Sequence, residues 1–163
     1  MLRAMSAPTP VTIASNSPEN TAKIAVLLAD ALRPGDTICL SGGLGAGKSH
    51  FARSVIAHLT GEVDIPSPTF TLVQTYSAAA FTIWHADLYR LSSPDEVAEL
   101  GLDEAFGHDL CLIEWPDRLP TPPGDALHLD LRQGADETER QLVFTHDGSW
   151  ADRLTVLIDA WRS

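Results

Sequence analysis

The feature that most constrains how this chain folds is a glycine-rich segment between two apolar runs. Residues 42–49 read Gly-Gly-Leu-Gly-Ala-Gly-Lys-Ser, which matches the phosphate-binding pattern G-x-x-x-x-G-K-[ST]. Residues 37–40 precede it as an expected strand, and residues 51–59 follow it as an expected amphipathic helix, which should stop near Thr60 and Gly61. A strand, a loop and a helix in this order predict a P-loop that binds nucleotide, within an α/β fold.

Each residue type in this loop suits phosphate. Glycine allows positive φ and close backbone approach, so successive N–H groups point into one concavity at the start of the helix. We expect Lys48 to lie along the β- and γ-phosphates and the Ser49 hydroxyl to bind Mg²⁺. The residues expected to bind the nucleotide here are Gly43, Leu44, Gly45, Ala46, Gly47, Lys48, Ser49 and His50.

The length and the cysteines limit the class of protein. With 163 residues the chain is most simply one domain, expected at residues 11–163 after a disordered N-terminus at residues 1–10. No apolar stretch approaches the ~18 residues that a membrane span needs, and no secretory signal is expected. Cys39 and Cys111 lie in apolar runs without metal-binding spacing, which favours a reducing compartment and a cytoplasmic protein.

The charge balance is strongly acidic. The net charge is −11, and the lysines are Lys23 and Lys48. A surface of this sign repels phosphate backbones, so direct affinity for nucleic acid is not expected. The field that attracts ATP must therefore come from Lys48, the loop amides and a bound Mg²⁺. An acidic exterior suits a basic protein partner, although it also serves solubility alone.

The remaining segments predict a mixed sheet. Further strands are expected at residues 11–14, 69–76, 81–87, 110–113, 126–131 and 140–145. Helices are expected at residues 18–32 with Ser17 as N-cap, from Ser93 to about Gly101, and after residues 148–149. Residues 69–76 and 81–87 should form a hairpin, and the apolar run 110–113 should be parallel to residues 37–40. The predicted fold class is α/β, a P-loop NTPase-like mixed sheet with a parallel core and antiparallel additions, flanked by helices.

Two acidic residues follow apolar strands and are candidates for the metal site. Glu114 is the better candidate, because its strand should be central and should open on the same crevice as the P-loop. Asp87 is the second, and either residue could instead be a solvated acid at a strand end. Thr69 could sense the γ-phosphate or be an ordinary strand residue. Trp115 could stack on a ligand or be structural, and His85 is read as a core histidine.

Four signatures occur in a defined order along the chain. They are Gly-Leu-Gly-Ala-Gly-Lys-Ser at 43–49, Ser-Pro-Thr-Phe-Thr-Leu-Val at 67–73, His-Ala-Asp-Leu-Tyr-Arg-Leu at 85–91 and Leu-Ile-Glu-Trp-Pro-Asp-Arg at 112–118. The guanine signature N-K-x-D is absent, which argues against a GTPase. Together the four segments closely resemble the TsaE family, the small bacterial P-loop ATPases of tRNA threonylcarbamoyladenosine biosynthesis. The likeness covers nearly all of the chain beyond the first dozen residues.

The resemblance implies an activity, partners and roles for single residues. Such proteins bind ATP and Mg²⁺, hydrolyse ATP slowly, and associate with the TsaD–TsaB pair, in which TsaD modifies the adenosine next to the anticodon of ANN-decoding tRNAs. The resemblance implies that Lys48 binds phosphate and that Ser49 and Glu114 bind Mg²⁺. It implies a switch hydroxyl at Thr69 and an acid needed for turnover at Asp87. It also implies that Trp115 lies beside the site and that Glu19 lies on the adenine side.

The chain departs from the family pattern in the P-loop. Gly43 stands where the family usually has Asp, and Ser49 and His50 stand where it has Thr. Serine keeps the hydroxyl that a metal needs. The lost charge at Gly43 is expected to change the rate of turnover more than binding, because amides rather than side chains bind phosphate there.

The sequence therefore predicts an ATPase that acts as a nucleotide-driven regulator of a tRNA-modifying complex and is not itself the transferase. Two other classes remain open. A small-metabolite kinase of this length could use Arg90 and Arg118 to clamp its substrate, and it would phosphorylate an acceptor. An ATP-binding scaffold would bind nucleotide without turnover, even beside its partners.

Overall fold

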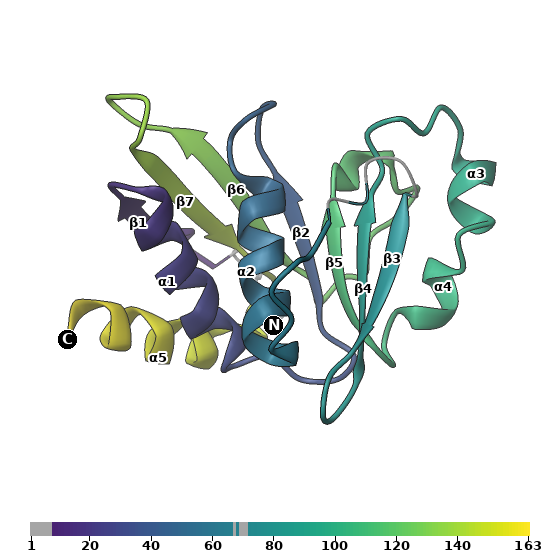
Figure 1. Ribbon diagram of the computed structural model, residues 1–163, viewed down its shortest axis with the longest axis horizontal. Helices are drawn as coiled ribbons and strands as arrows, with labels where there is room; N and C mark the ends of the chain where they lie inside the picture. Colours follow the sequence, from purple (N-terminus) through teal and green to yellow (C-terminus); the bar gives the residue numbers. More distant parts are fainter. Residues whose placement is uncertain (1–7, 67, 69–71) are drawn as a thin grey trace, which may run out of the picture.

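A seven-stranded sheet runs through the computed structural model, which describes residues 8–66, 68 and 72–163 (Figure 1). The strand order is β1-β7-β6-β2-β5-β4-β3. The strands are β1 (Val11–Ser15), β2 (Thr37–Ser41), β3 (Val73–Ser77), β4 (Thr82–Asp87), β5 (Leu110–Glu114), β6 (Leu127–Gln133) and β7 (Arg140–Thr145). The helices are α1 (Pro18–Ala29), α2 (Lys48–Thr60), α3 (Pro94–Ala98), α4 (Leu102–Ala105) and α5 (Ala151–Arg162), with a 3₁₀ turn η1 at Pro116–Arg118.

The centre of the sheet is parallel and its margins are antiparallel. Strands β6, β2, β5 and β4 run in one direction, whereas β7 is antiparallel to β6 and to β1, and β3 is antiparallel to β4. This confirms the predicted mixed sheet, including the β3–β4 hairpin and the parallel pairing of β5 with β2. Because parallel strands end at one edge, β2, β5 and β4 all point their carboxyl ends toward the loop before α2 (Figure 1).

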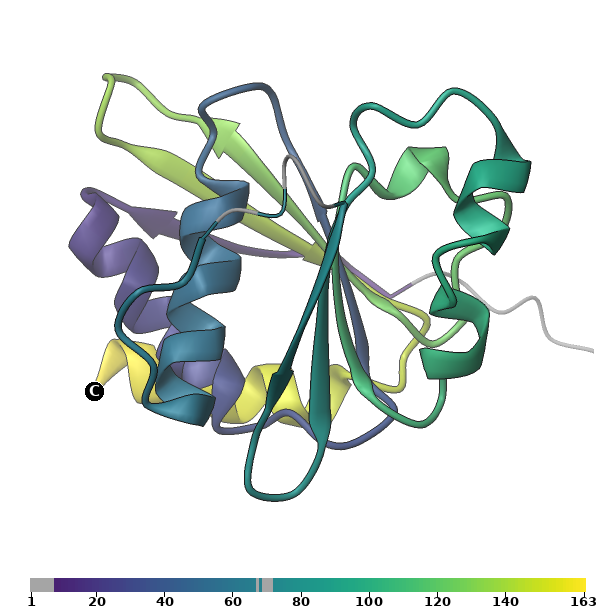
Figure 2. The same cartoon turned by 45° about the vertical axis from the view of Figure 1, so that its right-hand side comes forward.

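Alternation along β5 builds two cores, one on each face of the sheet. Leu110 and Leu112 pack in the cluster that contains residues of α1, α2 and α5, and Cys111 and Ile113 pack in the cluster under α3 and α4. Successive strand residues point to opposite faces, so a strand that is apolar throughout must be covered twice. Figure 2 shows α1 and α2 on one side of the strands and α3 and α4 on the other.

Helix boundaries follow local sequence signals where those signals are strong. Ser17 caps α1 by accepting a hydrogen bond from the backbone N–H of Asn20 at 3.1 Å, with Pro18 in the first turn as expected. Gly61, in the left-handed region, ends α2 as predicted. None of the helices in the described part of the chain is long and apolar enough to cross a bilayer.

Two expectations about elements need correction, and one helix was not predicted. Helix α1 ends at Ala29 and not near Leu32, because Leu32 reaches the core from the turn that follows the helix. The third strand begins at Val73, after Leu72 with its left-handed φ of 65°. The short helix α4 was not predicted. Disorder was expected at residues 1–10, of which residues 1–7 are outside the described residues. The expected strand start at residues 69–71 is wholly outside them.

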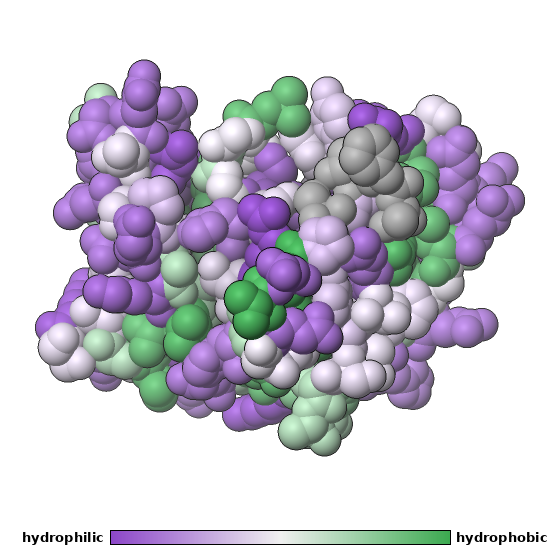
Figure 3. Space-filling view, in the orientation of Figure 1, coloured by the Kyte–Doolittle hydropathy of each residue, from purple (hydrophilic) through white to green (hydrophobic). Residues whose placement is uncertain are grey.

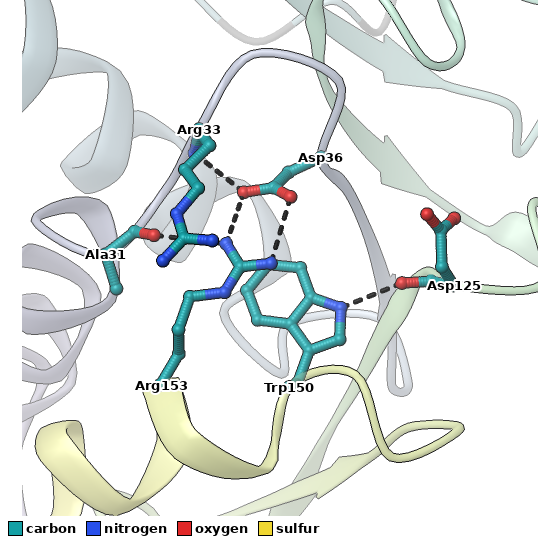
Figure 4. Close-up of polar contacts among 6 residues, drawn as sticks. All are labelled: Ala31, Arg33, Asp36, Asp125, Trp150 and Arg153. Atoms are coloured by element: carbon teal, nitrogen blue, oxygen red, sulfur yellow. Dashed lines mark hydrogen bonds and ion pairs between the residues drawn. The ribbon is translucent and has the colours of Figure 1, made fainter.

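Helix α5 is tied to the turn between α1 and β2 by a partly buried ion pair. Arg153 donates from both terminal nitrogens to the Asp36 carboxylate, at 2.6 and 3.2 Å, and stacks 3.7 Å from the ring centroid of Trp150 (Figure 4). Asp36 also accepts the backbone N–H of Arg33, and Trp150 donates to the carbonyl of Asp125. The C-terminal helix is thereby attached to the segment that leads into β2.

Candidate functional site

The loop before α2 and the carboxyl ends of β4 and β5 surround one cavity of about 410 Å³. Its lining includes Lys48 and Ser49 at the start of α2, Asp87 at the end of β4, and Glu114 and Trp115 at the end of β5. In the sheet register Asp87 lies opposite Glu114, and Glu114 lies opposite Leu40 of the strand before the loop. The topology therefore brings together side chains from three separate parts of the sequence.

The loop conformation requires glycine most clearly at two positions. Gly42 has a φ of 142°, and a Cβ there would meet the carbonyl oxygen of Leu131 at 2.6 Å. Gly47, directly before α2, has a φ of 105°. Residues other than glycine rarely adopt either backbone conformation, so these two glycines let the chain leave β2 and enter α2 within a few residues. Gly43 is unconstrained in this sense, since nothing lies within 4 Å of an added Cβ.

Lys48 is buried beneath the loop. Its Nζ donates to the carbonyl oxygens of Gly42 at 2.7 Å and Gly43 at 2.8 Å, and it lies 4.3 Å from the ring centroid of Trp115. Burial lowers the pKa of Lys48, and the nearby carboxylates of Glu114 and Asp87 partly offset this. A cation held among carbonyl groups and an aromatic face is well placed to attract an anion into the cavity.

The Ser49 hydroxyl and the Glu114 carboxylate contact each other directly. Ser49 Oγ donates to Glu114 Oε1 at 2.8 Å, across 65 positions of sequence, and Glu114 is only 2% exposed. A hydroxyl and a carboxylate are the hard oxygen ligands that Mg²⁺ accepts, with waters and phosphates completing its octahedron. No group of three or more His, Cys, Asp or Glu side chains suited to a metal occurs in the described residues. This pair thus fits an ion that arrives with a nucleotide and not a resident structural metal.

Asp87 and Trp115 line the same cavity from the ends of β4 and β5. Asp87 is mostly buried and accepts the backbone N–H of Tyr89 at 3.0 Å. Trp115 has a left-handed backbone, with a φ of 58° and a ψ of 56°, and its ring lies 4.8 Å from that of Tyr89. A non-glycine residue in this conformation is strained, and such strain gathers at functional sites. The two rings form an aromatic rim beside Lys48.

Not every sequence candidate lies in this cavity. Thr69 falls outside the described residues. Glu19 is exposed in the first turn of α1 and lines neither this cavity nor a smaller one of about 190 Å³ beside the loop, which its neighbours Pro18 and Thr21 line. His50 borders both cavities and its Nε2 lies 2.9 Å from the carbonyl oxygen of Pro18.

Sequence reasoning missed several residues of the site. Arg53 lines the main cavity, and a signal for it existed, because it lies four residues after Ser49 on the same face of α2. Tyr89 lies inside one of the quoted signatures but was given no role. Arg140, at the start of β7, donates to the loop carbonyls of Ala46 at 3.2 Å and Gly45 at 3.4 Å. No local pattern marks Arg140, since only the pairing of the β6–β7 hairpin brings it to the loop.

Comparisons with known proteins point to one family. Residues 15–142 match the family described as threonylcarbamoyl adenosine biosynthesis protein TsaE. A tRNA threonylcarbamoyladenosine biosynthesis protein TsaE of Rickettsia felis is 49% identical over 77% of this chain and 74% of its own length. The protein of that name from Bacillus subtilis is 37% identical over 85% and 87%. The crystal structure of Bacillus subtilis YdiB superposes with a TM-score of 0.72 at 30% identity, covering 98% of this chain and 97% of that one.

Proposed function

The chain belongs to the TsaE family of tRNA threonylcarbamoyladenosine biosynthesis, and we propose that its part there is that of a Mg²⁺-dependent ATPase which regulates the TsaD–TsaB transferase. ANN-decoding tRNAs are the substrates of the complex, and ATP and Mg²⁺ are the cofactors of this subunit. We further propose that the protein works in the cytoplasm, where tRNA is modified.

The observation that carries this proposal is the contact between Ser49 Oγ and Glu114 Oε1 at the mouth of the P-loop. A P-loop alone binds nucleotide, whereas hydrolysis also needs a carboxylate for Mg²⁺. Here Ser49 and Glu114 would hold Mg²⁺, which neutralises charge on the phosphates when it is bound. The N–H groups of the loop and Lys48 would bind the phosphates themselves.

The remaining residues of the cavity would orient the nucleotide and the attacking water. Asp87 faces the same cavity as Glu114 and is the acid proposed to be needed for turnover. Trp115, with its ring near Lys48, would cover the phosphates and keep bulk water away from them. Thr69 is proposed as the switch hydroxyl that responds to the γ-phosphate. Pro18 and Thr21, beside the smaller cavity, support a position for adenine near the start of α1.

The regulatory role follows from how a nucleotide site shifts a conformational equilibrium. ATP and ADP differ at the γ-phosphate, so a segment that contacts this phosphate has two arrangements, and a partner that binds one of them better is controlled by hydrolysis. The acidic surface favours a role in which TsaD and TsaB carry the tRNA contact.

Steady-state phosphate release, measured with and without purified TsaD–TsaB, tests the proposal. We expect slow turnover by the chain alone and a several-fold higher rate with the pair. An unchanged rate over a range of partner concentrations would contradict the regulatory model. Release of free phosphate without any phosphorylated acceptor would argue against the alternative of a small-metabolite kinase, and absence of turnover in every mixture would favour a scaffold.

A further inference from the structure

A buried histidine contacts the carboxylate of Glu114 from the neighbouring strand. His85, on β4, is fully buried, and its Nε2 lies 2.6 Å from Glu114 Oε2. In the β4–β5 register the partner of His85 is Leu112, so the ring reaches diagonally to the next residue on the same face of the sheet. The other carboxylate oxygen accepts the Ser49 hydroxyl. Each oxygen of Glu114 therefore has its own partner.

Packing alone does not explain a histidine at this position. The Nδ1 atom of His85 is buried and has no hydrogen-bond partner among the described residues. A buried polar atom without a partner destabilises the fold, and an apolar side chain would avoid that loss. Because an ionised carboxylate only accepts hydrogen bonds, Nε2 is the atom that carries the proton in this contact. What the ring contributes is thus one hydrogen bond to Glu114.

That hydrogen bond determines how the carboxylate is oriented. Glu114 is almost fully buried, so Oε2 would have no water to replace His85 as its partner. A glutamate side chain has three rotatable bonds, and a free carboxylate would turn to regain a hydrogen bond. Any such turn moves Oε1 away from the Ser49 hydroxyl, which is the arrangement that a shared metal requires.

We propose that His85 is a positioning residue, which holds Glu114 in the orientation where Oε1 meets the Ser49 hydroxyl and can share Mg²⁺ with it. The proposal rests on the proposed function, because it presupposes that the ion binds at this pair. His85 touches neither nucleotide nor metal and acts only through Glu114. Its loss should therefore weaken the binding of Mg²⁺ and leave metal-free nucleotide binding intact.

The test compares His85→Gln with His85→Asn in the full chain. The glutamine amide places an N–H donor near the position of Nε2, whereas the shorter asparagine reaches only as far as Nδ1. ADP affinity is measured by calorimetry in EDTA and across a Mg²⁺ series, and unfolding in urea reports stability. His128→Asn, which changes a half-buried histidine on β6, is the matched control.

We expect ADP affinity in EDTA to stay within about twofold of the unchanged protein in all three variants. The Mg²⁺ concentration at half-saturation should rise about tenfold or more in His85→Asn and stay near the original value in His85→Gln and in His128→Asn. If His85→Asn does not fold, His85→Leu, which has no donor, takes its place in the comparison with His85→Gln.

Equal Mg²⁺ dependence in the two His85 variants would overturn the proposal, whether both resemble the unchanged protein or both are weakened. Mg²⁺ binding would then not depend on whether the side chain at position 85 places an N–H donor close enough to Glu114. Failure of the proposed function gives a different result, since the unchanged protein would then bind ADP without any dependence on Mg²⁺.

Discussion

Two residues of the site make separable contributions, and single substitutions should reveal this. Lys48→Ala removes the cation that attracts phosphate, so we expect ADP affinity to fall at least tenfold both in EDTA and in Mg²⁺. Glu114→Gln keeps the size of the side chain but removes its charge, so metal-free affinity should hold while Mg²⁺ dependence of binding and turnover is largely lost. Calorimetry under the two conditions measures both. Full Mg²⁺-dependent turnover in Glu114→Gln would show that the metal is held elsewhere.

The two buried thiols should make the stability of the folded state depend on pH. Burial raises the pKa of Cys39 and of Cys111 from an ordinary value of 9.0 to about 12. As pH rises, the thiols of the unfolded chain therefore lose their protons before those of the folded protein do. The contribution of the thiols to the stability of the folded state is fully present below about pH 9. Between pH 9 and 12 the free energy of unfolding falls by up to about 1.4 kcal/mol per pH unit for each thiol.

Urea unfolding at pH 8 and pH 10 measures this effect, and replacement of both cysteines by alanine should reduce the loss of stability between the two pH values. The native protein should also react negligibly with a thiol reagent at pH 8, with both thiols reacting after unfolding. Rapid modification of either cysteine in the native protein would contradict the buried environment.

At the level of residues, the sequence was informative where chemistry follows from a local pattern. Ser49 and Glu114 were named because one closes a P-loop motif and the other ends an apolar strand, and the structure brings the two into contact. His85 was read as a core histidine, since its contact with Glu114 depends on the register of two strands. Arg140 could not be found, because its partners in the loop lie more than ninety positions away.

Among the secondary-structure elements, the β6–β7 hairpin supports the P-loop from outside. Arg140 bonds the carbonyls of Gly45 and Ala46 and also those of Glu137 and Glu139 in its own hairpin. In a trans peptide the N–H of the next residue points opposite to the carbonyl. The N–H of Ala46 is bonded to the Gly43 carbonyl at 3.1 Å, so the amide that Arg140 helps to keep turned away from the guanidinium, toward the side where phosphate would bind, is that of Gly47, which follows the Ala46 carbonyl.

We expect Arg140→Met to weaken ADP binding about three- to tenfold, equally with and without Mg²⁺, because about 1 kcal/mol of loop ordering is lost. Calorimetry in EDTA and in Mg²⁺ measures this. Arg132→Met is the control, since Arg132 lies exposed on β6 and pairs only with Asp130 among the contacts described. An ADP affinity that does not change in Arg140→Met would mean that the loop holds its shape without the hairpin.

Helix α5 depends on the ion pair shown in Figure 4. Arg153→Met removes the guanidinium that stacks on Trp150 and leaves the Asp36 carboxylate, itself 13% exposed, without its bidentate partner. We expect the free energy of unfolding to fall by about 1–3 kcal/mol. Arg162→Met, at the exposed end of the same helix, should change it by less than about 0.5 kcal/mol. Equal urea midpoints for the two variants would show that the ion pair contributes nothing to the attachment of α5.

The elements that the sequence predicted correctly are those with sharp boundaries or strong periodicity. The end of α2 follows from Gly61, and the parallel strand β5 follows from an uninterrupted apolar run. The predicted end of α1 was wrong because Leu32 continues the apolar spacing after the hydrogen-bonded helix has ended. Helix α4 has four residues, too few for any periodic signal, and its burial against the sheet stabilises it.

On the scale of the whole molecule, the net negative charge argues against direct contact between this chain and tRNA. Acidic residues outnumber Lys and Arg by 22 to 11, and the face shown in Figure 3 is largely hydrophilic, with apolar residues in small patches. Several basic groups are engaged within the molecule: Lys48 lies under the P-loop, Arg140 bonds its carbonyls, and Arg153 pairs with Asp36. Arg53 lines the cavity proposed for ATP. These four basic residues are therefore not free to follow a phosphate backbone, and the excess of acidic residues opposes such binding elsewhere.

We therefore expect the chain alone not to retard a tRNA anticodon stem-loop in a gel-shift assay at 0.15 M salt, even at tens of micromolar protein. Electrostatic binding to RNA requires basic groups that displace counterions, and it weakens steeply as salt increases. TsaD–TsaB, which we propose carries the tRNA contact, is the positive control. Retardation by this chain alone that disappears between 0.05 and 0.2 M salt would reveal a basic surface that the net charge conceals. The division of labour proposed for the complex would then have to include direct contact between this chain and the tRNA.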